Sequence, residues 1–136
     1  MNDDTLLIRK NAKQKTLSKA FFVHVKEEII GPSYELSLVF CSQSVSKKLN
    51  QKFRKKNKPT NILSFPLTKT SGEIFIDQKT AQTDAKKFEL DTLSFVGFLY
   101  IHGLLHLKGY EHSSTMKRLE LKYFKQFFPN KRILYV

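Results

Sequence analysis

The chain has 136 residues, 40% of them hydrophobic, which suffices for one domain with a real core but not for two. Its 24 Lys and Arg against 12 Asp and Glu give a net charge of +12 and a pI near 9.8, which favours an anionic partner such as nucleic acid. No apolar stretch approaches the ~20 residues of a membrane-spanning helix, and the first residues do not resemble a signal peptide, so we expect a cytoplasmic protein that does not span a membrane.

The first half of the chain is expected to mix strands and helices. Apolar residues recur at helical spacing in one segment and alternate with polar residues in another. A third segment, capped by Ser42 or Ser44, is expected to be a helix that runs to about Phe53, with Val45 and Leu49 facing inward together with Phe53. The expected elements are a strand at 5–8, a helix at 16–29, a strand at 34–41, this capped helix, and two strands at 61–65 and 73–76 that pair with each other.

The second half is expected to be helical. The predicted helices cover residues 77–88, then 91 or 92 to 108, then 113 or 114 to 127. The middle helix has two neighbouring apolar faces, so it should be central and mostly buried. The last helix should pack through Met116, Leu119, Tyr123 and Phe127.

Three histidines near the end of the middle helix have the spacing of a metal site. His102 and His106 are four residues apart, so they share a helix face and can direct two nitrogens at one ion. Gly109 can take the left-handed conformation that ends a helix, which would let the chain turn back and bring His112 to the same ion. Imidazole suits zinc, and three protein ligands leave a fourth position for water, so the run predicts one catalytic zinc ion per chain.

Two other interpretations of these histidines were weighed. The spacing also matches the metzincin proteases, but Gly103 stands where those enzymes carry the glutamate that takes a proton from water. The alternative is that the histidines belong to an ordinary amphipathic helix, but three at these spacings, with a glycine between the second and third, argue against chance. A lone histidine, His24 between Val23 and Val25, is interpreted as structural.

A run of basic residues from Lys47 to Lys58 contains no acid. Such a run repels itself unless a polyanion approaches, so it predicts contacts with phosphates; the alternative is a solvated helix face that keeps the protein soluble. Arg54 is singled out because a guanidinium can grip a phosphate through two parallel hydrogen bonds. The candidate RNA-contacting residues are Lys48, Lys52, Arg54, Lys55, Lys56 and Lys58.

Three segments resemble the YbeY family of bacterial zinc-dependent endoribonucleases that take part in ribosomal RNA maturation. The run from His102 to His112 resembles the family's HGxLHLxGYDH signature, residues 49–66 resemble LNxxYRxKDxPTDVLSFP, and residues 72–76 resemble GDIxI. The segments occur in the family's order. The sequence departs from the family pattern at four positions: Asn57 and Asn61 replace aspartates, and Glu73 and Glu111 replace aspartates with a longer acid.

The resemblance implies an α+β fold for residues 1–136, with a single mixed sheet of about four strands, five or so helices and a zincin-like metal helix beneath a cleft. It also implies that His102, His106 and His112 hold zinc and form the catalytic site together with Arg54. The implied substrate is single-stranded ribosomal RNA, cut during maturation of the 3′ end of small-subunit ribosomal RNA, with the small ribosomal subunit as partner.

The sequence leaves several alternatives open. Either a water whose pKa zinc lowers toward ~7 or the RNA 2′-hydroxyl can attack phosphorus. Two rivals to an endoribonuclease are a zinc peptidase and a non-catalytic ribosome assembly factor that keeps zinc for stability. The oligomeric state and the physiological metal also stay open, since three histidines accept nickel, cobalt or copper as well.

Overall fold

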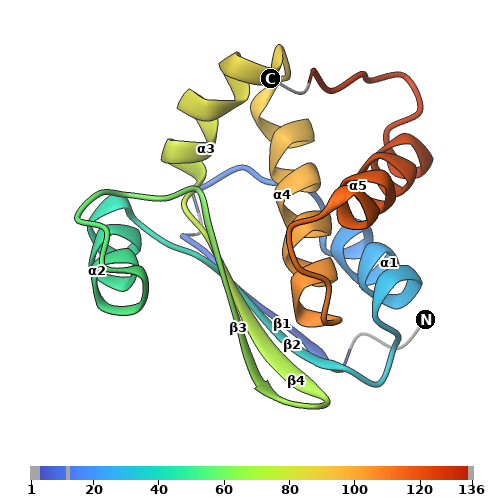
Figure 1. The fold of residues 1–136 in the computed structure, drawn as a ribbon, viewed down its shortest axis with the longest axis horizontal. Coiled ribbons are helices and arrows are strands. Elements are labelled where there is room, and N and C mark those ends of the chain that lie inside the picture. The colour runs from blue at the N-terminus through green and yellow to red at the C-terminus, as the bar shows by residue number, and fades with distance from the viewer. Residues whose placement is uncertain (1–3, 12, 135–136) are drawn as a thin grey trace.

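The structure is a computed structural model, and it describes residues 4–11 and 13–134. Strands and helices alternate along the chain before two long helices close it (Figure 1). The elements within this described part are β1 (Leu6–Arg9), α1 (Lys19–Ile29), β2 (Glu35–Phe40), α2 (Gln43–Arg54), β3 (Ile62–Thr68), β4 (Ser71–Ile76), α3 (Gln78–Ala85), the 3-10 helix η1 (Lys86–Phe88), α4 (Thr92–Leu107) and α5 (Ser114–Phe127).

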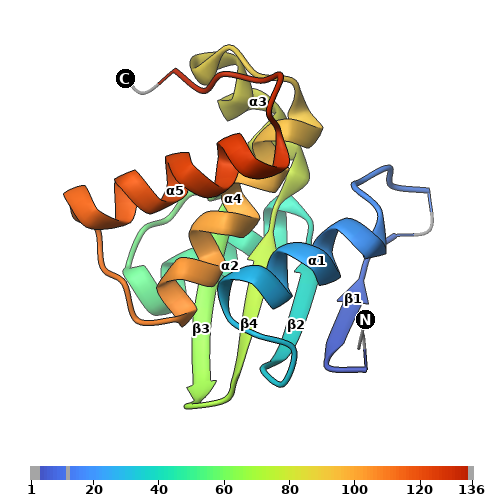
Figure 2. The ribbon, with the colours of Figure 1, turned by 90° about the vertical axis from the view of Figure 1, so that its right-hand side faces the viewer.

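The four strands form one mixed sheet in the order β1-β2-β4-β3. β2 runs parallel to both β1 and β4, whereas β3 pairs antiparallel with β4, as predicted for the two β-prone runs. Helices α1, α4 and α5 cover one face of the sheet, and α2 lies on the opposite face (Figures 1 and 2). The predicted α+β class with a four-stranded mixed sheet is confirmed, and β3 is an edge strand beside α4.

Helix α4 is the centre of the core, as its two apolar faces predicted. Eleven of its 16 residues are buried, and Asp91 caps its first turn by accepting a hydrogen bond from the Ser94 N–H at 3.1 Å. Gly103 lets the helix lie close to the sheet, because a Cβ there would meet Ile74 and Ile62 at 2.9 and 3.0 Å. This close packing places the last turns of α4 beside β3, where the site lies.

Two helix ends differ from the sequence prediction. The first helix begins at Lys19 rather than near Thr16, because the Ser18 hydroxyl caps it by accepting from the Phe21 N–H at 3.1 Å. The helix expected at 77–88 is α-helical only to Ala85 and then tightens into η1, which ends at a left-handed Glu89. The other helices begin and end within one or two residues of their predicted bounds.

The predicted inward face of α2 is wrong. Val45 and Phe53 are 40% and 54% exposed, and the helix buries Ser46 and Asn50 instead. The reason is polar: the Ser46 hydroxyl donates to Asp77 at 2.7 Å, and the Asn50 amide donates to the Lys58 carbonyl at 2.9 Å. Helix α2 is therefore attached through hydrogen bonds of Ser46 and Asn50, and Val45 and Phe53 remain exposed while Leu49 is half-buried.

A search of the described residues for membrane spans finds no single helix of sufficient length and hydropathy. Only the pair formed by Gln78–Phe88 and Thr92–Leu107 meets both criteria together, and the two members meet at a bend of 100°.

Candidate metal centre

The end of α4 has the chain reversal that the sequence predicted at Gly109. Gly109 has φ 110°, and its N–H donates to the His106 carbonyl at 3.0 Å, while the Tyr110 N–H donates to the Leu105 carbonyl at 3.0 Å. This pair of bonds is the Schellman arrangement that closes a helix at a left-handed glycine. Because the chain turns back there, His112 returns to the face of α4 that carries the other two histidines.

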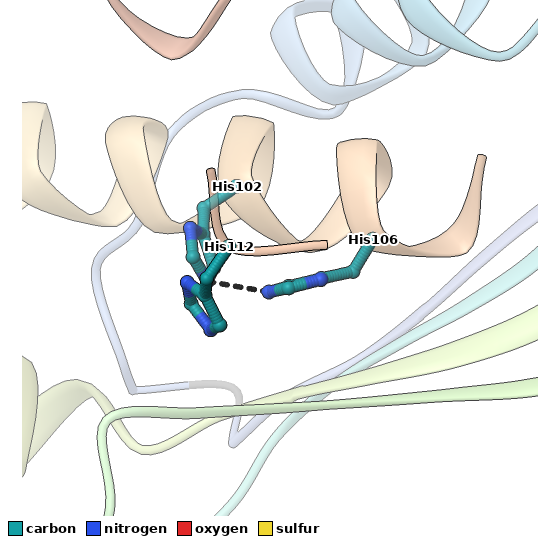
Figure 3. A group of neighbouring side chains, drawn as sticks. All are labelled: His102, His106 and His112. Carbon is teal, nitrogen blue, oxygen red and sulfur yellow. Dashed lines mark hydrogen bonds between the residues drawn. The ribbon is translucent and has the colours of Figure 1, made fainter. Parts of the chain in front are cut away.

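The three histidines converge on one point (Figure 3). One ring nitrogen from each of His102, His106 and His112 lies within 4.8 Å of the others. The Nε2 atoms of His102 and His106 are 3.0 Å apart, and the ring of His112 faces the same space at 4.7 Å from the His106 ring. His102 and His106 are half-buried and His112 is exposed, so the cluster opens toward solvent through His112.

Two of the three imidazoles are held in place through their second nitrogen. Nδ1 of His102 is hydrogen-bonded to Oε2 of Glu120, whose side chain is 8% exposed. Nδ1 of His106 is 2.9 Å from the carbonyl of Tyr110, which the chain reversal places there. A carboxylate and a carbonyl only accept, so each Nδ1 carries the proton and each Nε2 is left as a free lone pair. Burial and the neighbouring His102 also lower the pKa of His106, so its ring is neutral at pH 7, the form that binds metal.

These residues fit a divalent metal ion. Two nitrogens bound to a tetrahedral zinc at ~2.0–2.1 Å lie about 3.3 Å apart, close to the 3.0 Å between the Nε2 atoms of His102 and His106. The outer hydrogen bonds from Glu120 and from a backbone carbonyl are those that orient metal-binding histidines in known sites. Three nitrogens leave a coordination position for a further ligand, so the donor set suits a catalytic rather than a structural ion.

The histidines lie at one side of a cleft of about 700 Å³. Arg54, from the last turn of α2, also lines this cleft, and its Nη2 lies 3.4 Å from the carbonyl of Ile62 on the edge strand β3. Partial burial lowers the pKa of this guanidinium, which nevertheless stays protonated near neutral pH. The structure thus brings together four residues that the sequence singled out, although 48 positions separate Arg54 from His102.

The other predicted RNA-contacting residues are distributed more widely. Lys56 lines the cleft with Arg54. Lys48 and Lys52 border a separate groove along α2, and Lys55 caps that helix in a left-handed conformation with φ 59°. Lys58 is exposed in the following loop. The basic run therefore contributes to two places, the cleft and a groove along α2.

The four departures from the family pattern occupy different places. Asn61 lines the cleft, and its amide donates to Asp84 at 2.9 Å, a bond that an aspartate at this position could not donate. Glu111 also lines the cleft. Asn57 is exposed beside α2, and Glu73 lies on β4 outside the cleft. None of the four interrupts the histidine cluster.

Gly103 argues structurally against the peptidase alternative. A Cβ at this position would lie 2.9–3.0 Å from side chains of Ile74, Ile62 and Ser64. Position 103 is therefore packed closely against the sheet, so a glutamate there would require the neighbouring side chains to rearrange.

Glu120 is the site residue that the sequence did not reveal. The predicted inward stripe of the last helix passed through Leu119 and Tyr123, whereas the most buried residues are Met116, Glu120 and Phe124, spaced four apart. A buried acid on a helix needs a polar partner, so the position of Glu120 in the sequence indicated that such a partner exists. The partner comes from another helix, which spacing within one helix does not disclose.

Removing the Glu120 carboxylate is expected to weaken metal binding. Glu120→Ala should lower zinc affinity by about 10- to 100-fold, because His102 loses the acceptor that fixes its orientation, and Glu120→Gln, which keeps an acceptor oxygen, should recover part of the loss. Competition with a chromophoric chelator measures the affinity. Glu28→Gln on α1 is the control for a lost carboxylate. Affinity equal to wild type in Glu120→Ala would show that the contact does not orient the ligand.

Comparison with known proteins gives a consistent result. The family model described as Endoribonuclease YbeY matches residues 1–128. Proteins named Endoribonuclease YbeY from Finegoldia magna and Alkaliphilus metalliredigens are both 32% identical; the matches cover 78% of this chain in each case, and 74% and 76% of those proteins. One from Persephonella marina is 29% identical over 87% of this chain and 85% of its own length.

A solved structure has the same fold. The solution structure of TM1509 from Thermotoga maritima superposes with a TM-score of 0.63 over 93% of this chain and 99% of that chain, at 24% sequence identity.

Proposed function

Since the chain belongs to the YbeY family of endoribonucleases and is accordingly a hydrolase that acts on RNA, we propose that it cuts single-stranded RNA with one zinc ion held by His102, His106 and His112. We propose further that its substrate is ribosomal RNA, at the 3′ end of the small-subunit species, and that it works in the cytoplasm with the small ribosomal subunit.

One observation carries the proposal: Arg54 and the three histidines line the same cleft. The guanidinium can hold two oxygens of a phosphodiester, and it remains positive while negative charge builds on phosphorus. The Glu120 carboxylate and the Tyr110 carbonyl hold two imidazoles with their Nε2 atoms toward the cleft. A zinc ion bound there would supply Lewis acidity next to the phosphate that Arg54 holds.

The identity of the nucleophile divides the mechanism into two routes. If water attacks, a P–O bond to water forms, one P–O ester bond breaks, and the products are a phosphate monoester and a hydroxyl end. If the 2′-hydroxyl attacks, the bond to O5′ breaks and a 2′,3′-cyclic phosphate forms first. Mass analysis of the immediate products separates the routes, because only the second yields the cyclic phosphate.

The position of the histidines favours a single strand. His102 and His106 are half-buried in the cleft, whereas Arg54 and Lys56, which also line it, are exposed. A phosphate must enter the cleft to reach the histidines, and a flexible strand can bend into it. An A-form duplex holds its phosphates on a stiff cylinder and its bases in the stack, so it reaches half-buried side chains less readily. The same argument favours RNA tails and loops.

The test is cleavage of an end-labelled small-subunit ribosomal RNA fragment with a single-stranded 3′ tail. We expect zinc-loaded protein to cut within the tail, a chelator to abolish the cuts, and added zinc to restore them. Annealing a complementary strand to the tail should protect it. Cuts that persist in the chelator, or that fall equally in duplex and tail, would contradict the proposal; a casein digest run in parallel tests the peptidase alternative.

A further inference from the structure

Phe53 is the residue whose position departs most from its predicted role. The sequence placed it in the core, yet 54% of it is exposed on the last turn of α2. An exposed phenylalanine alone is common in soluble proteins and has no consequence. Phe53 is not alone, because its ring packs against that of Phe65 with centroids 4.8 Å apart, and Phe65 in turn packs against Phe75 at 5.8 Å.

This aromatic platform, defined as Phe53, Phe65 and Phe75, lies on the face of the sheet opposite the histidines. Ile62 and Ser64 on β3 face Gly103 of α4, so the alternation of the strand turns Phe65 to the other face, where α2 lies (Figure 1). Phe65 and Phe75 are half-buried, and Phe65 contacts both of the other rings. The most exposed ring, Phe53, is therefore held by Phe65, which itself packs against Phe75.

The platform is connected to the cleft through Arg54. Phe53 and Arg54 are consecutive residues of α2, so their Cα atoms are about 3.8 Å apart. The Arg54 side chain reaches the edge strand β3 at the Ile62 carbonyl and lines the cleft, whereas Phe53 packs on the other face of the same strand. A strand of RNA that leaves the phosphate at Arg54 and crosses the edge of β3 arrives directly at the Phe53 ring.

The charged residues around the platform indicate which kind of ligand it binds. The Lys52 ammonium lies 5.2 Å from the centroid of the Phe53 ring, and Lys47 and Lys48 line a groove on the same helix. No acid occurs between positions 47 and 58. On the sheet side Glu73 pairs with Phe65 in the strand register, and Glu35 of β2 lies on the same face of the sheet, because Ser37 pairs with Glu73. The positive charge of α2 therefore favours the phosphate backbone of a nucleic acid, and the negative charge on the sheet disfavours it. We infer that a base, rather than a phosphate, lies over the rings.

Resting on the proposed function, we propose that Phe53 is a stacking site for one unpaired base of the RNA substrate, adjacent to the nucleotide whose phosphate Arg54 holds. Aromatic rings beside a basic groove are the combination by which proteins bind single strands, and they bind any base because each has a π face. The platform then contributes to strand preference, since a base paired within a duplex cannot lie flat on Phe53.

The experiment combines protein variants with abasic RNA. A fluorescently labelled single-stranded RNA of about ten nucleotides, carrying one abasic site that is moved along the strand, is titrated by anisotropy with metal-depleted protein, so that the strand stays intact. Phe53→Ala should weaken binding by about 5- to 150-fold, the range of one base–aromatic stack, and Phe53→Tyr should retain wild-type affinity. Val45→Ala, a truncation of another exposed apolar residue of α2, should leave the affinity unchanged.

The abasic scan supplies the specific signature. On wild-type protein, one position should be sensitive, and on Phe53→Ala the abasic substitution at that position should cause no further loss, because the two changes remove the same contact. A scan with no sensitive position overturns the inference without any protein variant. A Phe53→Ala protein that binds RNA with wild-type affinity also overturns the inference. If that variant has lost affinity for the small ribosomal subunit, the platform binds a protein partner instead of a base.

Failure of the inference is distinguishable from failure of the proposed function. Wild type that binds and cuts the single-stranded tail, together with unaffected Phe53→Ala, overturns the stacking site alone. Wild type that neither binds nor cuts single-stranded RNA overturns both.

Discussion

A His106→Ala variant is expected to lose RNA cleavage while it keeps its fold. His106 contributes one of three converging nitrogens, and two imidazoles hold a divalent ion much more weakly than three. With the ion lost, several kcal/mol of Lewis-acid stabilisation disappear from the transition state, so cleavage should fall by about 10³-fold or more. Single-turnover cleavage of the tailed ribosomal RNA fragment, with zinc content determined by metal analysis, measures both effects.

His24→Ala is the matched control for this variant. His24 is exposed on α1, and its ring lies 6.4 Å from that of Phe127, so the same chemical change is made away from the cleft. Cleavage by His24→Ala should equal that of wild type. Equal cutting by His106→Ala and wild type, after identical purification, would show that the activity came from a contaminating nuclease or from a site without this histidine.

Thermal unfolding separates the enzyme from the assembly factor alternative. Zinc at about 100 times its Kd should stabilise wild type by about 2.7 kcal/mol and stabilise His106→Ala far less. Without metal, the variant loses the hydrogen bond to the Tyr110 carbonyl, about 0.5–1.5 kcal/mol, together with the contacts of the half-buried ring, including the one to His102. If ribosomal RNA processing returned in cells once a lower temperature restored folding, zinc would serve stability alone, and the non-catalytic interpretation would stand.

The histidine cluster was predictable because its information is local. His102 and His106 share a helix face by spacing, and Gly109 predicts the reversal that delivers His112, so three ligands follow from eleven consecutive residues. The same holds for α4, whose apolar surroundings at every turn predicted burial. Short-range geometry and periodicity decide both features, and the tertiary structure does not alter them.

The contacts made between distant elements were not predictable in the same way. Glu120 reaches His102 from α5, and nothing in either helix alone specifies the crossing that joins them. On α2 the apolar periodicity favoured burying Val45 and Phe53, but hydrogen bonds from Ser46 to Asp77 and from Asn50 to Lys58 turned a neighbouring side of the helix inward. The pattern of apolar and polar residues predicted the wrong buried face for α2, because polar side chains make the contacts that hold this helix to the rest of the protein.

Arg54→Ala is expected to give a folded, zinc-binding protein with little activity. The guanidinium lies in the last turn of α2, and its one hydrogen bond, to the Ile62 carbonyl, is long at 3.4 Å, so truncation costs little stability. In the cleft, loss of a preorganised donor to the reacting phosphate should lower kcat/KM by about 10²- to 10³-fold.

Two further variants test whether the loss of activity comes from the paired donors of Arg54 or from its charge. Arg54→Lys keeps the charge but not the paired donors, so it should recover only part of the activity, whereas Arg9→Ala on the far edge strand β1 removes one positive charge without approaching the cleft and should cut like wild type. Zinc affinity and unfolding midpoint should match wild type in all three. Full activity in Arg54→Ala would remove the phosphate-holding role and leave the histidines as the whole catalytic site, while an equal loss in Arg9→Ala would reduce Arg54 to its share of the overall charge.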